Sequence, residues 1–147
     1  MGALPARIQS VPVLLVFTDR GVAPILYGSV RSLLPGGVLL DMRHIVKVAK
    51  GGREAIAEFL RKVRKVKEFI PYESIEEIRM ERRALPDRMV LARCTVIVIR
   101  LKDGGERVYR IIAGEGMGIT KEEYLEMFRR IADSVPVKMV ISEEVQQ

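Results

Sequence analysis

Cations are the side chains best able to do chemistry in this 147-residue chain, and their excess is concentrated in one stretch. Residues 43–67 hold nine basic and two acidic side chains, a net charge of +7, whereas the whole chain carries +6. Cations at this density attract anionic headgroups and nucleic-acid phosphates. The sequence therefore predicts an anion-binding or partner-binding surface made of Lys47, Lys50, Arg53, Arg61, Lys62, Arg64 and Lys65.

The same stretch also has a purely structural interpretation. Its apolar residues recur at helical spacing, so we predict a basic amphipathic helix over residues 53–69. One face of this helix is formed by Ile56, Phe59, Leu60 and Val63. That face either packs on the protein's own core or lies in a membrane interface. In the first case the basic face is solvated and partly paired with Glu54 and Glu58.

The sequence contains few residues of the types that catalyse reactions or bind metal ions. Cys94 and His44 are the single residues of their kinds, so they cannot form an internal disulfide or a four-ligand structural zinc site. We expect Cys94 to be a core residue and His44 to lie at a loop or strand end without a partner nucleophile. We therefore expect no catalytic residue, no metal and no cofactor. A small enzyme with a pocket of carboxylates and arginines is the least favoured alternative.

Glycines at positions 114, 116 and 118 lie between a predicted strand and a predicted helix, where backbone amides can cradle a phosphate. Their spacing does not match the dinucleotide-binding fingerprint, and Glu115 would place a carboxylate where an anion should sit. We favour a flexible connection for this segment.

Four glutamates, at positions 73, 76, 77 and 81, could be imagined as a metal or acid–base cluster. If this segment is a strand, Glu77 and Glu81 share a face with Arg79 between them. That pattern predicts a ladder of ion pairs rather than a set of metal ligands.

Hydrophobic periodicity predicts the elements that position these residues. Strands or hairpins are predicted over residues 11–17, 22–30, 38–40, 92–113 and 137–141. Residues 74–83 fit both a helix, through the capping-box pair Ser74 and Glu77, and a strand, through alternation; we favour a turn followed by a strand. A capping box at Thr120 predicts a helix over residues 121–133.

Two short phrases and the order of elements carry a resemblance to a known family. The phrases are Thr18-Asp19-Arg20 and Ile70-Pro71-Tyr72-Glu73-Ser74-Ile75, and the similarity in element order covers residues 10–141. The chain resembles prokaryotic pleckstrin-homology-like domains. The resemblance implies an α+β fold, a partly open antiparallel barrel or strongly bent sheet with a C-terminal helix, into which helix 53–69 is inserted. It also implies a scaffold that binds protein or lipid.

Composition sets the remaining expectations. The length fits one domain over residues 1–147, with an ordered core at 10–141 and a frayed acidic tail at 142–147. Arg outnumbers Lys by 17 to 8 and Asn is absent, a pattern typical of chains selected for heat. The apolar run 11–17 is too short to span a bilayer, so we expect no transmembrane segment and a cytoplasmic location.

We therefore expect a non-catalytic binding module that contacts a protein partner or an anionic surface, membrane or polyanion, through residues 43–67. Nucleic-acid binding by the same cations is the alternative. An open sheet edge at 22–30 or 137–141 would also allow a homo-oligomer to form by strand addition.

Overall fold

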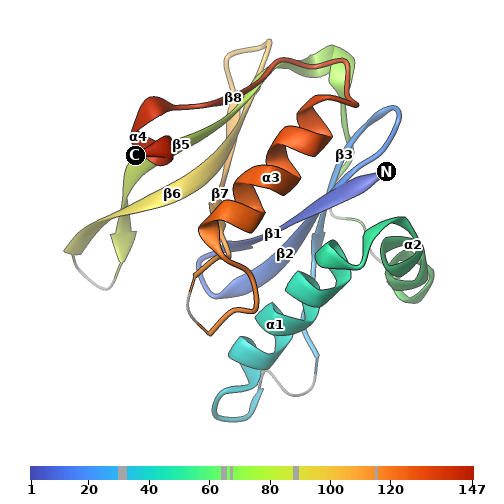
Figure 1. Ribbon diagram of the computed structural model, residues 1–147, viewed down its shortest axis with the longest axis vertical. Helices are drawn as coiled ribbons and strands as arrows, with labels where there is room; N and C mark the ends of the chain where they lie inside the picture. Colours follow the sequence, from blue (N-terminus) through green and yellow to red (C-terminus); the bar gives the residue numbers. More distant parts are fainter. Residues whose placement is uncertain (30–32, 64–65, 67, 88–89, 115) are drawn as a thin grey trace.

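The computed structural model describes the chain except for residues 30–32, 64–65, 67, 88–89 and 115 (Figure 1). One eight-stranded sheet organises the fold, with the strand order β4-β3-β2-β1-β7-β6-β5-β8. Its strands are β1 (Gly2–Ile8), β2 (Val11–Phe17), β3 (Gly21–Leu26), β4 (Ile70–Pro71), β5 (Ile75–Asp87), β6 (Val90–Leu101), β7 (Glu106–Ile111) and β8 (Met139–Ile141). Neighbouring strands are antiparallel except β5 and β8, which are parallel. Within the described ranges β4 and β8 do not pair with each other, so the sheet is not closed.

The helices pack on this sheet and confirm the α+β class. They are α1 (Gly37–Lys50), α2 (Gly52–Lys62), α3 (Lys121–Ala132), the short α4 (Glu143–Gln146) and a 3-10 turn, η2 (Tyr72–Ser74). α1 contacts β1 and β2, and both α2 and α3 contact β1. Figure 1 shows α3 crossing the sheet and α1 running down to the lower end of the molecule. None of the helices in the described part of the chain is long and apolar enough to cross a bilayer.

The core lies between these helices and the middle strands. β2 reads as an almost continuous apolar run, and its residues 13–17 are essentially fully buried. A strand covered on both faces needs such a run rather than alternation. Tyr124 of α3 is also fully buried, and its hydroxyl donates to the carbonyl oxygen of Pro5 in β1 at 2.8 Å. This bond ties α3 to a central strand.

The turn between β2 and β3 contacts the segment that begins at Ile70. The Thr18 hydroxyl accepts hydrogen bonds from the N–H groups of Arg20 and Gly21, each at 3.1 Å. A Cβ at Gly21 would lie 2.3 Å from the carbonyl oxygen of Ile70, so the approach of β3 to β4 requires glycine. The Tyr72 hydroxyl donates to the carbonyl oxygen of Thr18 at 2.6 Å. The two phrases that carried the family resemblance are therefore neighbours in space.

Several predicted elements are confirmed. β2, the β6–β7 hairpin and α3 lie where expected, and residues 74–83 form the end of a turn and then a strand. α3 begins with the predicted capping box, in which Thr120 Oγ1 accepts from the Glu123 N–H at 3.1 Å and Glu123 Oε1 accepts from the Thr120 N–H at 3.0 Å. β8 lies at a sheet edge, but the addition of a second copy there stays a prediction.

The strand predicted at residues 38–40 is wrong, because these residues belong to α1. The apolar positions continue at helical spacing through Met42, Ile45 and Ala49, all of which are buried. A short apolar run read without its continuation is indistinguishable from a strand.

Two further boundaries differ from the prediction. The helix expected over 53–69 is α2, which ends at Lys62 because Val63 adopts an extended backbone conformation. The strand expected over 22–30 ends at Leu26.

Both ends of the chain are better ordered than the sequence suggested. β1, which the sequence did not predict, lies in the middle of the sheet. The tail expected to fray over residues 142–147 contains α4, and Val145 is 1% exposed because it packs on the core. Arg93 forms an ion pair with Glu144, which also holds this segment.

Candidate functional site

The apolar face of α2 packs on the core. Ile56 is fully buried and Phe59 is 5% exposed, while Leu60 and Val63 are partly buried against the same cluster. His44 lies in α1 and not at a loop or strand end as predicted, and its ring is 6.3 Å from the Phe59 ring of α2. Of the two roles predicted for this helix face, the structure shows the core role.

The cations predicted between 47 and 65 do not converge on one point. Lys50 donates to the carbonyl oxygen of Gly118 at 2.9 Å. It also forms an ion pair with Glu123 at 2.9 Å, and the hydrogen bond from Lys50 to the Glu123 carboxylate lowers the pKa of Glu123. Arg61 and Lys62 lie 3.3 and 3.6 Å from the Glu58 carboxylate. The other described cations of the set, Lys47 and Arg53, are exposed, and Arg64 and Lys65 fall outside the described residues.

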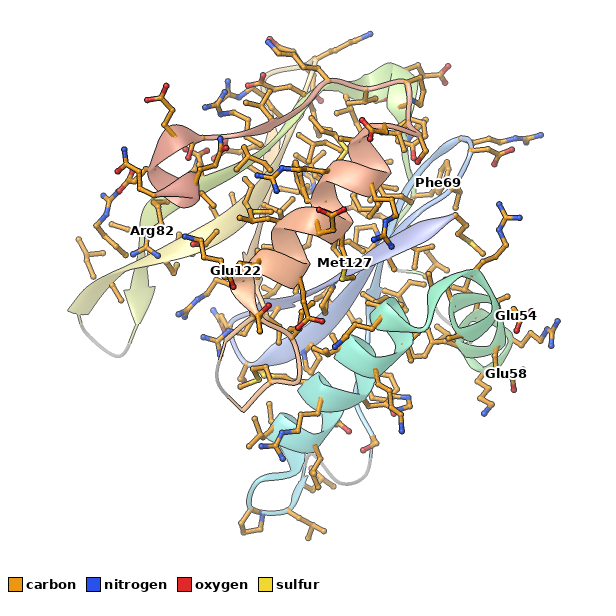
Figure 2. All side chains as sticks on the ribbon, in the orientation of Figure 1. Glu54, Glu58, Phe69, Arg82, Glu122 and Met127 are labelled. Carbon is orange, nitrogen blue, oxygen red and sulfur yellow. The ribbon has the colours of Figure 1, made fainter. Side chains whose placement is uncertain are left out.

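α2 presents its charged side to solvent. Figure 2 shows Glu54 and Glu58 on the outer side of α2, pointing away from the sheet. Glu58 takes part in the pairing that the sequence suggested for this side. The outer side of α2 is thus a solvated ion-pair surface.

α1 carries a more continuous stripe of cations. Arg43, Lys47 and Lys50 recur at spacings of four and three residues and are all exposed, so they share one face of the helix. Leu40 lies at the beginning of this stripe, three residues before Arg43. The stripe borders a groove of about 630 Å³ between α1 and the glycine segment 116–118.

Four exposed leucines surround the beginning of α1. We call them the leucine tip: Leu33, Leu34, Leu39 and Leu40. Leu33 is 86% exposed and Leu34 is 64% exposed, and the other two are exposed as well. Single exposed leucines are common on protein surfaces, but a group of this kind indicates a surface that contacts something apolar.

A short hydrogen-bonded turn shapes the leucine tip. Gly36 adopts φ = 76°, a left-handed conformation that favours glycine, and its carbonyl oxygen accepts from the Leu40 N–H at 3.2 Å. The Gly37 N–H donates to the carbonyl oxygen of Leu34 at 2.9 Å. These two bonds reverse the chain direction and lead directly into the first turn of α1. The segment lies at the lower end of the molecule in Figure 1.

Asp41 fixes the start of α1 to the chain that leaves β3. Its side chain is fully buried, and its carboxylate accepts from the Ser29 N–H at 3.0 Å and from the Ser29 hydroxyl at 2.7 Å. A buried carboxylate needs such partners. Neither this anchor nor the leucine tip is predicted above, although the two Leu-Leu pairs around Pro35-Gly36-Gly37 are a visible signal in the sequence.

The glycine segment faces α1 with its carbonyl groups. Gly116 accepts from Arg43 Nε at 2.7 Å, and Gly118 accepts from Lys50. The N–H groups of Gly114 and Met117 are used within the segment itself. The segment connects β7 to α3, as predicted, and these two amides do not form a cradle for phosphate; the predicted flexibility stays a prediction.

The ion-pair ladder predicted for β5 is confirmed for Glu77, whereas Glu81 pairs with Arg83 at 3.2 Å instead of with Arg79. Glu77 lies 3.8 Å from Arg79, 3.2 Å from Arg100 and 3.9 Å from Lys138. A hydrogen bond from Arg83 lowers the pKa of Glu106 on β7. Within the described residues, no group of three His, Cys, Asp or Glu side chains is placed to hold a metal ion.

Comparison of the chain with models of protein families, with curated proteins and with solved structures finds no match.

Proposed function

We propose that this chain is a non-catalytic binding module that docks on an anionic membrane surface in the cytoplasm. The leucine tip enters the interface, and the cations of α1 contact the lipid headgroups. One observation carries the proposal: the exposed leucine tip lies at the beginning of α1, and the exposed cationic stripe continues along the same helix. Leu40 of the tip and Arg43 of the stripe are about one turn apart.

The leucine tip and the cations of α1 are close enough to contact the same membrane surface at the same time. Interfacial elements bury their apolar groups about 5–10 Å into the boundary of headgroups and acyl chains. Along the axis of α1, Arg43 lies about 4.5 Å and Lys47 about 10 Å from Leu40. With the tip embedded, both cations are then at the level of the headgroups, where each contributes on the order of 1 kcal/mol.

The cations outside this stripe have a supporting role. Arg53, Arg61 and Lys62 are solvated, so they add long-range attraction to an anionic surface without forming a site. Nucleic-acid binding by the same cations ranks second, because phosphates would gain nothing from the four leucines.

We also propose that the scaffold is pleckstrin-homology-like, a partly open barrel or strongly bent sheet. The contact between the turn at Thr18 and the segment at Tyr72 supports this proposal, and so does the packing of the late helix α3 on β1. The departures are the insertion of α1 and α2 between β3 and β4 and the parallel pairing of β8.

Vesicle flotation tests the proposed docking. We expect the chain to float with vesicles that contain phosphatidylglycerol and not with vesicles of phosphatidylcholine alone. The double variant Leu33→Ser/Leu34→Ser should lose most of this binding. Its matched control is Phe69→Ser, which removes a side chain that is 48% exposed in the upper part of the molecule, away from the leucine tip (Figure 2).

Thermal unfolding confirms that both variants are folded before their binding is compared. Equal flotation of the wild type and the Leu33→Ser/Leu34→Ser variant would contradict the proposal, as would failure of the wild type to bind anionic vesicles. A shift of duplex DNA in a gel, without vesicle binding, would favour the nucleic-acid alternative.

A further inference from the structure

We propose that a second site, outside the docking surface, binds phosphate groups in a hollow lined by arginines. Five cations surround this hollow, which has a volume of about 400 Å³. We call it the arginine hollow, and its cations are Arg7, Arg82, Arg93, Arg110 and Lys121. The inference goes beyond the proposed function, because none of these residues belongs to the leucine tip or to the stripe on α1.

The strand pairing creates the hollow. β7 pairs with β6 only over residues 96–100 of β6, whereas β6 pairs with β5 from Val90 onward. The β5–β6 hairpin therefore extends beyond β7, and Figure 2 shows Arg82 on this extension. The notch between the extension and the end of β7 is the hollow, and Lys121 at the beginning of α3 lines another side.

The cations of the hollow come from distant parts of the sequence, namely β1, β5, β6, β7 and the beginning of α3. Arg7 of β1 is directly opposite Arg110 of β7, so their side chains start from the same face of the sheet. An anion bound between Arg7 and Arg110 would attract both guanidinium groups.

The lining matches the chemistry of phosphate. Among the described residues that line the hollow, five are cations and none is acidic, while Thr95 contributes a hydroxyl group. Four of the cations, all but Arg93, are half-buried, which strengthens their interaction with an anion relative to open water. Guanidinium groups present paired N–H donors that fit the oxygens of a phosphate.

The internal contacts of these side chains hold them in place and leave capacity for a ligand. Arg82 donates to Thr95 Oγ1 at 3.3 Å and to the carbonyl oxygen of Arg93 at 3.4 Å. Arg93 pairs with Glu144 at the rim, and Lys121 donates to the carbonyl oxygen of Gln147 at 3.1 Å. Because a guanidinium has five N–H donors, Arg82 can hold these contacts and still bind phosphate oxygens.

The hollow contains its own reporter. Cys94 is half-buried and lines the hollow, so the core position predicted for it is wrong. It is the single cysteine of the chain, so the rate at which a maleimide labels this thiol reports whether the hollow is occupied. The phosphate groups could belong to a soluble polyphosphate or to a lipid headgroup, and the two sources are separated by the probe.

The experiment measures two quantities with tripolyphosphate as the soluble probe and phosphatidic acid vesicles as the lipid probe. Calorimetry gives the affinity for tripolyphosphate, and Cys94 labelling is followed with each probe. We expect binding that weakens by about tenfold or more in Arg82→Gln/Arg110→Gln, because charge-assisted hydrogen bonds are lost. The control Arg129→Gln/Arg130→Gln removes the same charge from an exposed part of α3 and should bind like the wild type.

The single variant Arg110→Gln keeps the test usable if the double variant does not fold. Slower labelling with tripolyphosphate supports a soluble ligand, and slower labelling with vesicles alone supports a headgroup. Unchanged labelling with both probes would overturn the proposal, and so would equal loss of affinity in the α3 control. The Leu33→Ser/Leu34→Ser variant should still bind tripolyphosphate, so failure of the membrane proposal and failure of this one can be told apart.

Discussion

Asp41 and Ser29 close the segment that carries the leucine tip. The Ser29 N–H and hydroxyl both donate to the buried Asp41 carboxylate, at 3.0 and 2.7 Å, across twelve residues of chain. The bonds hold the beginning of α1 against the chain that leaves β3. The beginning of α1, which carries Leu39 and Leu40 of the tip, is therefore held in place, and so are the cations that follow on the same helix.

Removing the Asp41 carboxylate should weaken both the fold and the docking. Asp41→Ala leaves two Ser29 donors without this acceptor, and we expect the free energy of unfolding to fall by about 3 kcal/mol. Ser29→Ala keeps the backbone hydrogen bond and should cost about half as much. Urea unfolding measures both values. If Asp41→Ala costs no more than Ser29→Ala, the carboxylate does not anchor the segment.

Reversing a charge in the stripe on α1 should weaken binding to anionic vesicles. Lys47→Glu replaces attraction by repulsion at the headgroup level, and we expect the partition coefficient to fall at least about fivefold, since each cation contributes on the order of 1 kcal/mol. The matched control is Lys102→Glu, an exposed charge reversal in the β6–β7 turn. Flotation over a salt series gives both values, and an equal effect of the two variants would mean that net charge alone determines binding.

Arg110→Gln should separate stability from anion binding. It removes one cation of the arginine hollow and keeps a polar side chain, so we expect the free energy of unfolding to stay within about 0.5 kcal/mol of the wild-type value. The affinity for tripolyphosphate should fall in the same variant. Urea unfolding and calorimetry on one preparation measure the two effects, and a loss of stability would show that Arg110 has a structural role instead.

The protein should lose stability at strongly alkaline pH. Burial raises the pKa of Tyr72 and that of Tyr109 from 10.0 to about 12. The unfolded chain therefore releases these phenolic protons near pH 10 while the folded chain keeps them, and stability falls as the pH rises from about 10 towards 12. Urea unfolding across this range should show a shallower decline for Tyr109→Phe, and an identical decline would contradict the assignment.

Local signals account for the parts of the fold that could be predicted from the sequence. The apolar run of β2, the Asp-Gly turn of the β6–β7 hairpin and the capping box of α3 each lie within a few residues. β1 has no such signal, because Pro5 argues against a central strand. The structure accommodates this proline just beyond the last β1–β7 pair, Ala6 with Ile111, where its missing N–H is not needed by β7.

The candidate sites depend on information that is not local. The sequence identified Lys47 and Lys50 by counting charge in a window, but α1 itself was missed, and with it the relation of these cations to the leucines. The arginine hollow is lined by positions 7, 82, 93, 110 and 121, which only the folded chain brings to one place. No window along the chain contains them, so the sequence alone does not reveal the hollow.

Fluorescence of a tryptophan placed in the leucine tip tests the central claim most directly. The chain has no Trp, so Leu34→Trp introduces a single indole at a position that is 64% exposed. We predict a blue shift of its emission when phosphatidylglycerol vesicles are added and no shift with phosphatidylcholine alone, because the indole leaves water for the interface. Unchanged emission under conditions in which the protein floats with the anionic vesicles would contradict insertion of the tip.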